Sequence, residues 1–401
     1  MKVALVHESL THLGGAERVL AELHQLFPEA PIYTLYHDEQ VVQTLFPDAD
    51  VRLSFLRHFP RVIRRHERLF LPTLPVVPET FDLSEYDVAI SSASAFAKGV
   101  VTRPGTLHIC YCHSPTRYLW DWYPSLLDEY RTRGFTRAAL VVLLHYLRLW
   151  DQTAARRVDR FVTNSFATQG RIKKYYGRDA EVIYPPVDVE RFTPHLSTVG
   201  PEGLPVRPAV APWKGAGFIP TRENTGYFLV VSRLSPYKRV GLVVNTFHKL
   251  ELPLVVAGEG RERRHLERLA GPRTSFRGFV PDVELPALYA GARAIIFPGE
   301  DDFGIVPVEA MAAGKPVIAY RRGGALETVI EGVTGEFFDE PLDAVLAETI
   351  RQFLEKEATY DPLVIRRHAE QFSRARFRSS FVRFVEEAWR EWQRDHRHGR
   401  A

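Results

Sequence analysis

The chain has 401 residues, of which 45% are hydrophobic, and its 52 basic and 49 acidic residues leave a formal net charge of +3. This length is too great for one ordinary hydrophobic core, and the hydrophobic content is sufficient for two, so the composition excludes a disordered chain and favours two globular domains. The nearly balanced charge gives no general argument for nucleic-acid binding.

The chain's two cysteines, Cys110 and Cys112, lie in a predicted strand. We expect their side chains to point to opposite faces of that strand and not to pair, as suits a reducing compartment. Residues 1–2 lead directly into an apolar strand, and the longest apolar run, 138–144, is far shorter than a membrane span. The expected location is the cytoplasm, with a peripheral position on the inner face of the cell membrane as a variant.

The first predicted unit is a strand, a glycine loop and a helix. Residues 3–7 form an apolar run, and Gly14 and Gly15 precede apolar residues at helical spacing. The glycines would let a phosphate or a sugar approach the carboxyl end of the strand closely. A dinucleotide fingerprint is excluded because the G-x-G-x-x-G pattern is missing here.

Two later patterns have competing interpretations. Asp48 and Asp50 have the D-x-D form of a metal motif, but they follow a proline in a predicted turn before strand 51–55, and we interpret them as turn residues. Residues 52–68 alternate six arginines with apolar side chains. This segment suits an anionic membrane surface, and it suits a solvated helix over the core equally well. RNA binding would require a recognised motif, which this segment lacks.

Further strands are predicted at 87–90 and 107–111, and the second runs directly into His113. A single histidine is usually structural, but the carboxyl end of a strand in an open α/β sheet is where ligand contacts are presented. After a strand near 182–184, prolines and glycines alternate, and no regular element is expected to persist. We place an interdomain linker at 196–225.

The second half begins with a strand at 227–231 and a turn that carries Arg233 and Lys238. Both cations lie near a strand's carboxyl end, where a guanidinium and an ammonium could neutralise a diphosphate without a metal ion. Gly258 and Gly260 follow strand 254–257 but are too few for a dinucleotide site.

Residues 298–314 contain the most informative pattern. The apolar run 294–297 ends at Pro298, and a helix is expected to start near Val306, with Pro307 at its first position and Gly314 as its stop. Its free N–H groups and positive dipole end would face an anion, which Gly304 would let approach.

Two acids flank this predicted anion site. Asp301 precedes the helix, and Glu309 is expected in its first turn. Carboxylates beside an anion are compatible only if they accept hydrogen bonds from neutral hydroxyls of the same ligand. A phosphorylated sugar meets both requirements.

The stretch 301–309 resembles the E-x7-E signature of the retaining glycosyltransferases of family 4, with Asp301 where the family usually has glutamate. Similar segments occur in the family's order along most of the chain. They are the glycine loop 14–18, the Cys-His-Ser-Pro-Thr-Arg-Tyr segment 112–118, the Pro-Pro-Val-Asp segment 185–188, Arg233 with Lys238, the strand end at 279–280 and segment 323–327.

The resemblance implies the GT-B fold, an α/β architecture of two doubly wound, Rossmann-like parallel-sheet domains facing across a cleft. The implied boundaries are an acceptor-binding domain at 1–195, the linker 196–225, a nucleotide-sugar domain at 226–372 and a helix at 373–401 that returns to the first domain. The implied catalytic residues are His113, which would contact the transferred sugar, with Asp301, Arg233 and Lys238. The residues assigned to donor binding are Gly14, Gly15, Phe279, Val280, Phe303, Gly304, Ile305, Val306 and Glu309.

The predicted function is retaining transfer of a hexose from a nucleoside diphosphate sugar to a hydroxyl of a glycan or lipid-linked acceptor, in polysaccharide or glycolipid biosynthesis. GDP-mannose is the preferred donor by resemblance, in particular to bacterial mannosyltransferases of surface polysaccharide assembly, and no metal or other cofactor is expected. Three alternatives remain: a UDP-sugar-dependent glucosyl- or galactosyltransferase, a GT-B sugar-nucleotide epimerase, and a catalytically silent nucleotide-sugar-binding protein.

Overall fold

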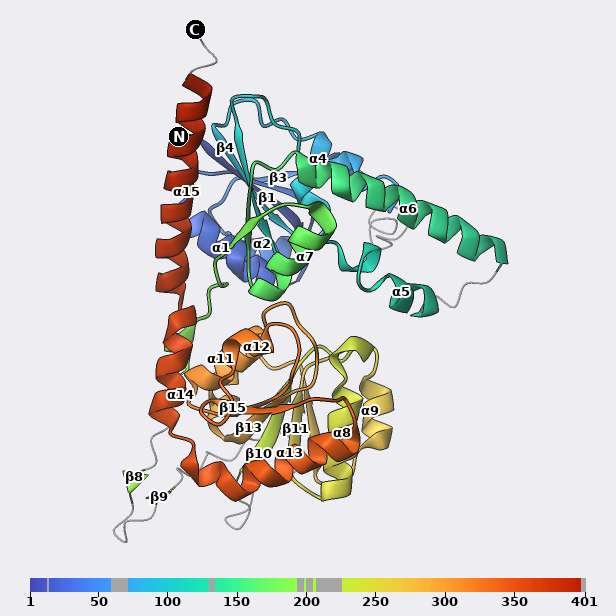
Figure 1. Cartoon of the computed structure of the whole chain (residues 1–401), viewed down its shortest axis with the longest axis vertical. Coiled ribbons are helices and arrows are strands. Elements are labelled where there is room, and N and C mark those ends of the chain that lie inside the picture. Colours follow the sequence, from blue (N-terminus) through green and yellow to red (C-terminus); the bar gives the residue numbers. More distant parts are fainter. Residues whose placement is uncertain are drawn as a thin grey trace. The chain divides into compact units, whose positions relative to one another are not determined.

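The computed structural model describes residues 1–12, 14–58, 71–129, 134–192, 198–199, 205–206 and 226–397. The chain divides into two units (Figure 1). The first consists of Met1–Pro186 together with Ala375–Ala401, and the second is Val187–Arg374. Each unit is built around its own parallel sheet, so the predicted pair of doubly wound domains is confirmed.

The sheet of the first unit has strand order β3-β2-β1-β4-β5-β6-β7, and all neighbouring pairs are parallel. Its strands are β1 (Val3–Leu10), β2 (Ile32–His37), β3 (Val51–Leu53), β4 (Val88–Ala93), β5 (Leu107–Cys112), β6 (Arg160–Thr163) and β7 (Ala180–Val182). β4 and β5 are buried along their whole length because helices cover both faces of the sheet.

The helices of this unit are α1 (Gly15–Leu26), α2 (Glu39–Leu45), α4 (Val76–Glu79), α5 (Tyr123–Glu129), α6 (Gly134–Arg156), α7 (Phe166–Tyr176) and most of α15 (Arg374–Arg397). α1 and α15 pack on one face, where Leu20 and Phe381 share a core with Leu5 of β1. α15 runs alongside α1 (Figure 1), and Arg378 of α15 pairs with Glu22 of α1 at 2.5 Å. α6 packs on the other face through Leu144 and Leu147.

The sheet of the second unit has order β12-β11-β10-β13-β14-β15 and is also parallel throughout. Its strands are β10 (Tyr227–Val231), β11 (Leu254–Ala257), β12 (Thr274–Gly278), β13 (Ala292–Phe297), β14 (Val317–Tyr320) and β15 (Gly335–Phe338). Its helices are α8 (Val240–Leu250), α9 (Arg263–Leu269), α10 (Leu285–Ala290), α11 (Ile305–Ala312), α12 (Ala325–Thr328), α13 (Asp343–Lys356) and α14 (Pro362–Ala369).

Each sheet has a point where the strand order reverses. In the first unit this point lies between β1 and β4, and in the second it lies between β10 and β13. Connections leave such a pair of strands in opposite directions, which opens a crevice at their carboxyl ends where α/β proteins bind ligands. These two strand pairs therefore define where a site should be sought.

Four local predictions were wrong. Cys110 and Cys112 lie in the same core cluster, on one face of β5, because residues two apart in a strand point the same way; both are free thiols. β1 continues to Leu10, since its last residues still pair with β2. Pro307 is the third residue of α11. The first N–H groups of a helix have no carbonyl partner within it, so the missing N–H of Pro307 removes no helical hydrogen bond. Glu309 consequently lies in the second turn.

Most of the predicted linker lies outside the described residues. Its described part is a short antiparallel pair, β8 (Thr198–Val199) with β9 (Pro205–Val206), so the expectation of no regular element fails there. In the basic segment 52–68, residues 59–68 also lie outside the described part of the chain. No helix in the described ranges is long and apolar enough to span a bilayer.

Candidate active site

The crevice of the second unit is bridged by an ion pair. Lys238 ends the short helical turn Pro236–Lys238 after β10, and Asp301 lies on the loop after β13. Their Nζ and Oδ1 atoms are 2.6 Å apart, and both side chains are largely shielded from solvent, at 17% and 21% exposure. The structure thus brings two predicted site residues together at the switch point, as a pair that the sequence did not indicate.

Glycines hold the loops on the Lys238 side of the crevice. A Cβ atom on Gly258 would lie 1.9 Å from the carbonyl oxygen of Ser232, and one on Gly260 would lie 2.2 Å from that of Leu234. Both glycines also have positive φ, which other residues rarely adopt. This close backbone packing fixes the loop that leads to Lys238, so the two glycines serve the loop's structure.

Glycines also fix the Asp301 loop. The N–H of Gly324 donates to the carbonyl of Asp301 at 2.9 Å, and a Cβ on Gly324 would lie 2.3 Å from the Cα of Phe303. Phe303 itself is buried and its ring contacts that of Phe372. Contacts with Gly324 therefore hold the loop in place on both sides of Asp302.

The start of α11 lies directly after this loop. Gly304 is the N-cap residue of α11, with φ 85°, and as a glycine it has no side chain that could bond to the helix start. Ile305 and Val306 are the first two residues of the helix. Their N–H groups have no carbonyl partner within the helix, and the positive end of the helix dipole lies here. This geometry suits a phosphate beside the Lys238 ammonium.

Glu309 is buried and already bonded. Its Oε2 accepts a hydrogen bond from the Tyr289 hydroxyl at 2.9 Å, and its Oε1 lies 3.4 Å from Nη2 of Arg191. Arg191 also pairs with Asp282 at 3.0 Å. Neither Arg191 nor Tyr289 carried a sequence signal, because each is far from Glu309 along the chain. A ligand hydroxyl that binds Glu309 must therefore compete with these two partners.

The remaining predicted residues of this unit lie at strand ends. Arg233 follows β10 and is exposed, and Phe279 and Val280 follow directly after β12. The Phe279 side chain is 69% exposed. Gly278, with φ 68°, turns the chain at this strand end, so its neighbours present backbone groups at the carboxyl edge of the sheet.

The crevice of the first unit contains a hydrogen-bonded chain of side chains. Nε2 of His113, directly after β5, lies 2.8 Å from the Ser92 hydroxyl on β4, and this hydroxyl lies 3.1 Å from Nδ1 of His7 on β1. Nε2 of His7 is 3.8 Å from the carboxylate of Glu17 on α1. The sequence singled out only His113, although Glu17 lies within the glycine-loop motif.

Burial sets the charge state of this chain. The pKa of His113 is lowered to about 3, first because burial disfavours the imidazolium and then because His7 is close. Burial alone would raise the pKa of Glu17, but its hydrogen bond to His7 and the charges of His7 and His12 lower it instead. At neutral pH His113 is thus a neutral imidazole, suited to hydrogen bonding with a sugar hydroxyl and unsuited to act as a general acid.

Gly14 makes room for Glu17. A Cβ on Gly14 would lie 2.7 Å from the Glu17 carboxylate, so a side chain at this position would displace the carboxylate from where it lies. Gly15 is the first residue of α1. The predicted glycine loop therefore supports the His7–Ser92–His113 chain in addition to any contact it makes with ligand.

Two family models match this chain. The model described as Glycosyltransferase Family 4 matches residues 13–191, and that described as Glycosyl transferases group 1 matches residues 217–372. Among curated relatives, Alpha-1,3/1,6-mannosyltransferase alg2 of Schizosaccharomyces pombe is 25% identical over 90% of this chain and 75% of its own length. D-inositol 3-phosphate glycosyltransferase of Salinispora arenicola is 31% identical over 59% of this chain and 57% of its own length.

Solved structures agree on the fold. HepE of Anabaena, solved with UDP, aligns over 96% of this chain and all of its own with a TM-score of 0.67 and 18% identity. Sucrose-phosphate synthase of Thermosynechococcus elongatus aligns over 97% with a TM-score of 0.70 and 16% identity. Two parallel-sheet units that align with these structures over nearly the whole chain have the GT-B fold. The matched models, which together span most of residues 13–372, place the chain in glycosyltransferase family 4.

Proposed function

We propose that this glycosyltransferase moves mannose from GDP-mannose to a hydroxyl of a glycan or lipid-linked saccharide, with retention of the donor's anomeric configuration. The observation that carries the nucleotide-sugar part of this proposal is the Lys238–Asp301 pair beside the start of α11. A cation and free N–H groups suit a diphosphate, and an adjacent carboxylate suits the hydroxyls of the attached sugar.

The preference for mannose rests on the relatives. Several that cover more than four fifths of this chain, at 25–26% identity, are named as alpha-1,3/1,6-mannosyltransferases. A UDP-sugar donor is the second candidate, because the structurally similar HepE was solved with UDP-glucose.

The four predicted catalytic residues and Glu309 each have a role in this proposal. Lys238 and Arg233 stabilise the departing diphosphate, so that no metal ion is needed. Asp301 orients the transferred sugar, and Glu309 accepts a hydrogen bond from the ribose. His113 supplies a neutral contact to the same sugar. The acceptor attacks on the face from which the diphosphate leaves.

A donor screen tests this proposal. GDP-mannose, UDP-glucose and UDP-galactose are each incubated with the enzyme in EDTA, and release of free nucleotide is measured with and without mannoside acceptors. We expect slow release from GDP-mannose alone and faster release with an acceptor. Release that needs a divalent ion would contradict stabilisation of the diphosphate by Lys238 and Arg233 without a metal ion. Release without acceptor, together with an epimerised sugar, would indicate an epimerase, and nucleotide-sugar binding without any release would indicate a silent binding protein.

We also propose peripheral association with an anionic membrane. Arg52 is held by Asp50, Tyr33 and Tyr86, so the basic contribution must come from the arginines beyond it in segment 52–68. α6 adds a stripe of exposed apolar side chains at helical spacing. They are Phe135, Val142, Tyr146 and Leu149, which are 87%, 68%, 53% and 53% exposed.

Liposome flotation tests this association. Replacing Arg61, Arg64 and Arg65 with serine should make flotation on anionic vesicles weaker and less salt-sensitive, since each basic residue near such a surface contributes on the order of 1 kcal/mol. Replacing Phe135 and Tyr146 with serine should weaken flotation at all salt concentrations. Flotation that neither set of replacements changes would exclude the proposal.

A further inference from the structure

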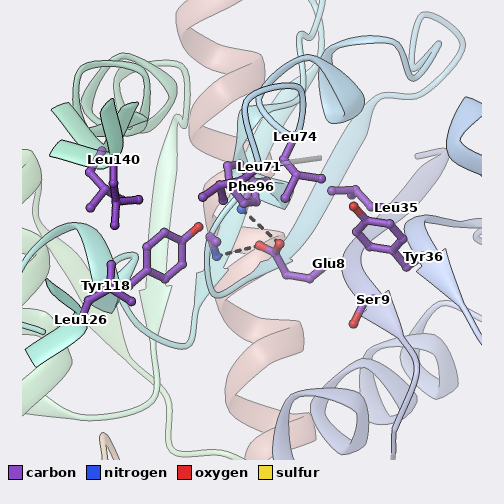
Figure 2. Close-up of a pocket in the computed structure, with 12 residues that line it drawn as sticks. Glu8, Ser9, Leu35, Tyr36, Leu71, Leu74, Phe96, Tyr118, Leu126 and Leu140 are labelled. Carbon is purple, nitrogen blue, oxygen red and sulfur yellow. Dashed lines mark hydrogen bonds between the residues drawn. The ribbon is translucent and has the colours of Figure 1, made fainter. Parts of the chain in front are cut away.

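The first unit contains an apolar pocket that the assigned site residues leave unexplained. Its volume is about 310 Å³, and it lies at the ends of β1 and β2, under α5 and α6 (Figure 2). Leu35, Leu74, Phe96 and Leu144 form its buried wall. Six further lining residues are only partly buried and so remain open to an occupant: Tyr36, Leu71, Ala95, Tyr118, Leu126 and Leu140.

Among the residues that the structure describes, Glu8 is the one charged side chain that lines this pocket, and its carboxylate is bound by the protein's own backbone. The Glu8 carboxylate accepts hydrogen bonds from the N–H groups of Ser94, Ala95, Phe96 and Ala97, at 2.7–3.2 Å, two of which are dashed in Figure 2. Oε1 accepts three of these bonds and Oε2 accepts one, so most of the acceptor positions of the carboxylate are taken. Glu8 is therefore bound to the loop after β4, and its negative charge disfavours an anionic occupant, whereas the leucine-rich lining favours an uncharged, largely apolar one.

The pocket adjoins the predicted acceptor side of the site. Glu8 lines it, and the preceding residue, His7, is linked through Ser92 to His113. Because neighbouring residues of a strand point to opposite faces, the pocket and the histidine chain lie on the two faces of β1 at the same crevice. A molecule bound at this crevice could place a sugar beside His113 and an apolar group in the pocket.

We infer that the acceptor is an amphiphile, a saccharide joined to a hydrocarbon chain, and that the first part of this chain occupies the pocket. This inference rests on the proposed glycosyl transfer and selects the lipid-linked acceptor over a free glycan. The volume is about twice that of an engineered 150 Å³ cavity that holds benzene, so it suits roughly ten to twelve carbons. A straight acyl chain and an isoprenoid chain share this chemistry.

Binding of alkyl mannosides tests the inference. Methyl, butyl, hexyl, octyl and farnesyl mannosides are titrated by calorimetry, below their micelle concentrations. Each added methylene should tighten binding about fourfold. Farnesyl mannoside binding more tightly than a straight-chain mannoside with the same number of carbons would indicate an isoprenoid, and the reverse would indicate an acyl chain. Equal affinity for methyl and octyl mannoside would overturn the inference.

Filling the pocket gives the matched control. Leu140→Trp on α6 should weaken octyl mannoside binding at least tenfold, whereas His145→Trp, at an exposed position of the same helix, should leave it unchanged. Leu71→Trp provides a second filling variant if Leu140→Trp is unstable. Unchanged octyl mannoside binding in a folded filling variant would overturn the inference.

GDP binding and slow donor hydrolysis are measured in the same variants. If the wild type also fails to bind GDP and to hydrolyse the donor, the proposed function is wrong. If the wild type does both, but mannoside affinity does not depend on chain length, only the inference about the pocket is wrong.

Discussion

At the scale of single residues, the Lys238–Asp301 pair determines which contact a donor diphosphate has to replace. In this structure the ammonium that should hold a diphosphate is held by a carboxylate at 2.6 Å. In the proposed function, donor binding would exchange one partner of Lys238 for another, and Asp301 would become available to a sugar hydroxyl. The pair thus keeps the site's charges balanced before the donor arrives.

The first prediction concerns Asp301→Asn. Turnover should fall about a hundredfold, because the reacting sugar loses the group that orients it and a misplacement of about 1 Å has that effect. GDP affinity should not fall, since the asparagine competes less for Lys238. Calorimetry with GDP, set beside initial rates, measures both quantities. Asp302→Asn, at the neighbouring position, is the control, and a loss of GDP affinity as large as the loss of rate would refute the assigned role.

The second prediction concerns pH and His108. This histidine is fully buried on β5 with Nε2 2.9 Å from the Ser91 hydroxyl, and burial lowers its pKa from 6.5 to about 3. Between these values the unfolded chain binds a proton that the folded protein does not, so folding stability falls as pH falls below about 6.5. Urea unfolding at pH 7 and pH 5 should show that His108→Gln loses about 2 kcal/mol less than wild type over this interval. Equal losses would mean that His108 is not the group responsible.

The sequence identified residues whose role follows from position along the chain. Lys238, Asp301 and His113 were found because each follows a largely apolar strand, and carboxyl ends of parallel strands share one edge of a sheet. The partners were not found. Tyr289 and Arg191 meet Glu309 only through the fold, and no spacing along the chain could place them.

At the scale of elements, the segment after His113 is anchored by one buried acid of α6. The Asp151 carboxylate accepts hydrogen bonds from Lys98 at 2.6 Å, Thr116 at 2.7 Å, and Trp120 and Tyr176 at 2.8 Å. Lys98 and Asp151 are both almost completely buried. Since Thr116 and Trp120 belong to the segment that leaves β5, this network couples α6 to the position of the His113 loop.

The third prediction is that Asp151→Asn destabilises the protein by about 3–5 kcal/mol, because it leaves the Lys98 charge buried without a counter-ion. Urea unfolding measures this loss. Thr153→Ala, on the exposed side of the same helix, should stay within about 0.5 kcal/mol of wild type. A similar small change for Asp151→Asn would show that the network does not anchor the segment.

The strands also show how much of the secondary structure could be predicted from the sequence. β10 and β11 were predicted with the bounds that the structure has, because buried parallel strands are continuous apolar runs. β1 was predicted only as far as His7 because the polar residues Glu8 and Ser9, which line the pocket, interrupt the apolar run before Leu10. Polar residues at the pocket thus concealed the end of this strand.

At the scale of the whole molecule, the residues assigned to the reaction are divided between the two units. Lys238, Asp301 and Glu309 belong to the second unit, and His113 belongs to the first. The chain passes from the first unit to the second after Pro186 and returns after Arg374, where α15 continues onto the first unit's core. The family assignment spans both units, so both are expected to be needed for transfer.

The most direct test of the central claim follows GDP-mannose turnover by NMR in the presence of EDTA, with octyl mannoside as acceptor. We expect GDP to form together with a new mannosyl anomeric signal of the donor's configuration, at a rate that Lys238→Ala lowers by about a hundredfold to a thousandfold. A product of inverted configuration, or turnover by Lys238→Ala at the wild-type rate, would contradict the account.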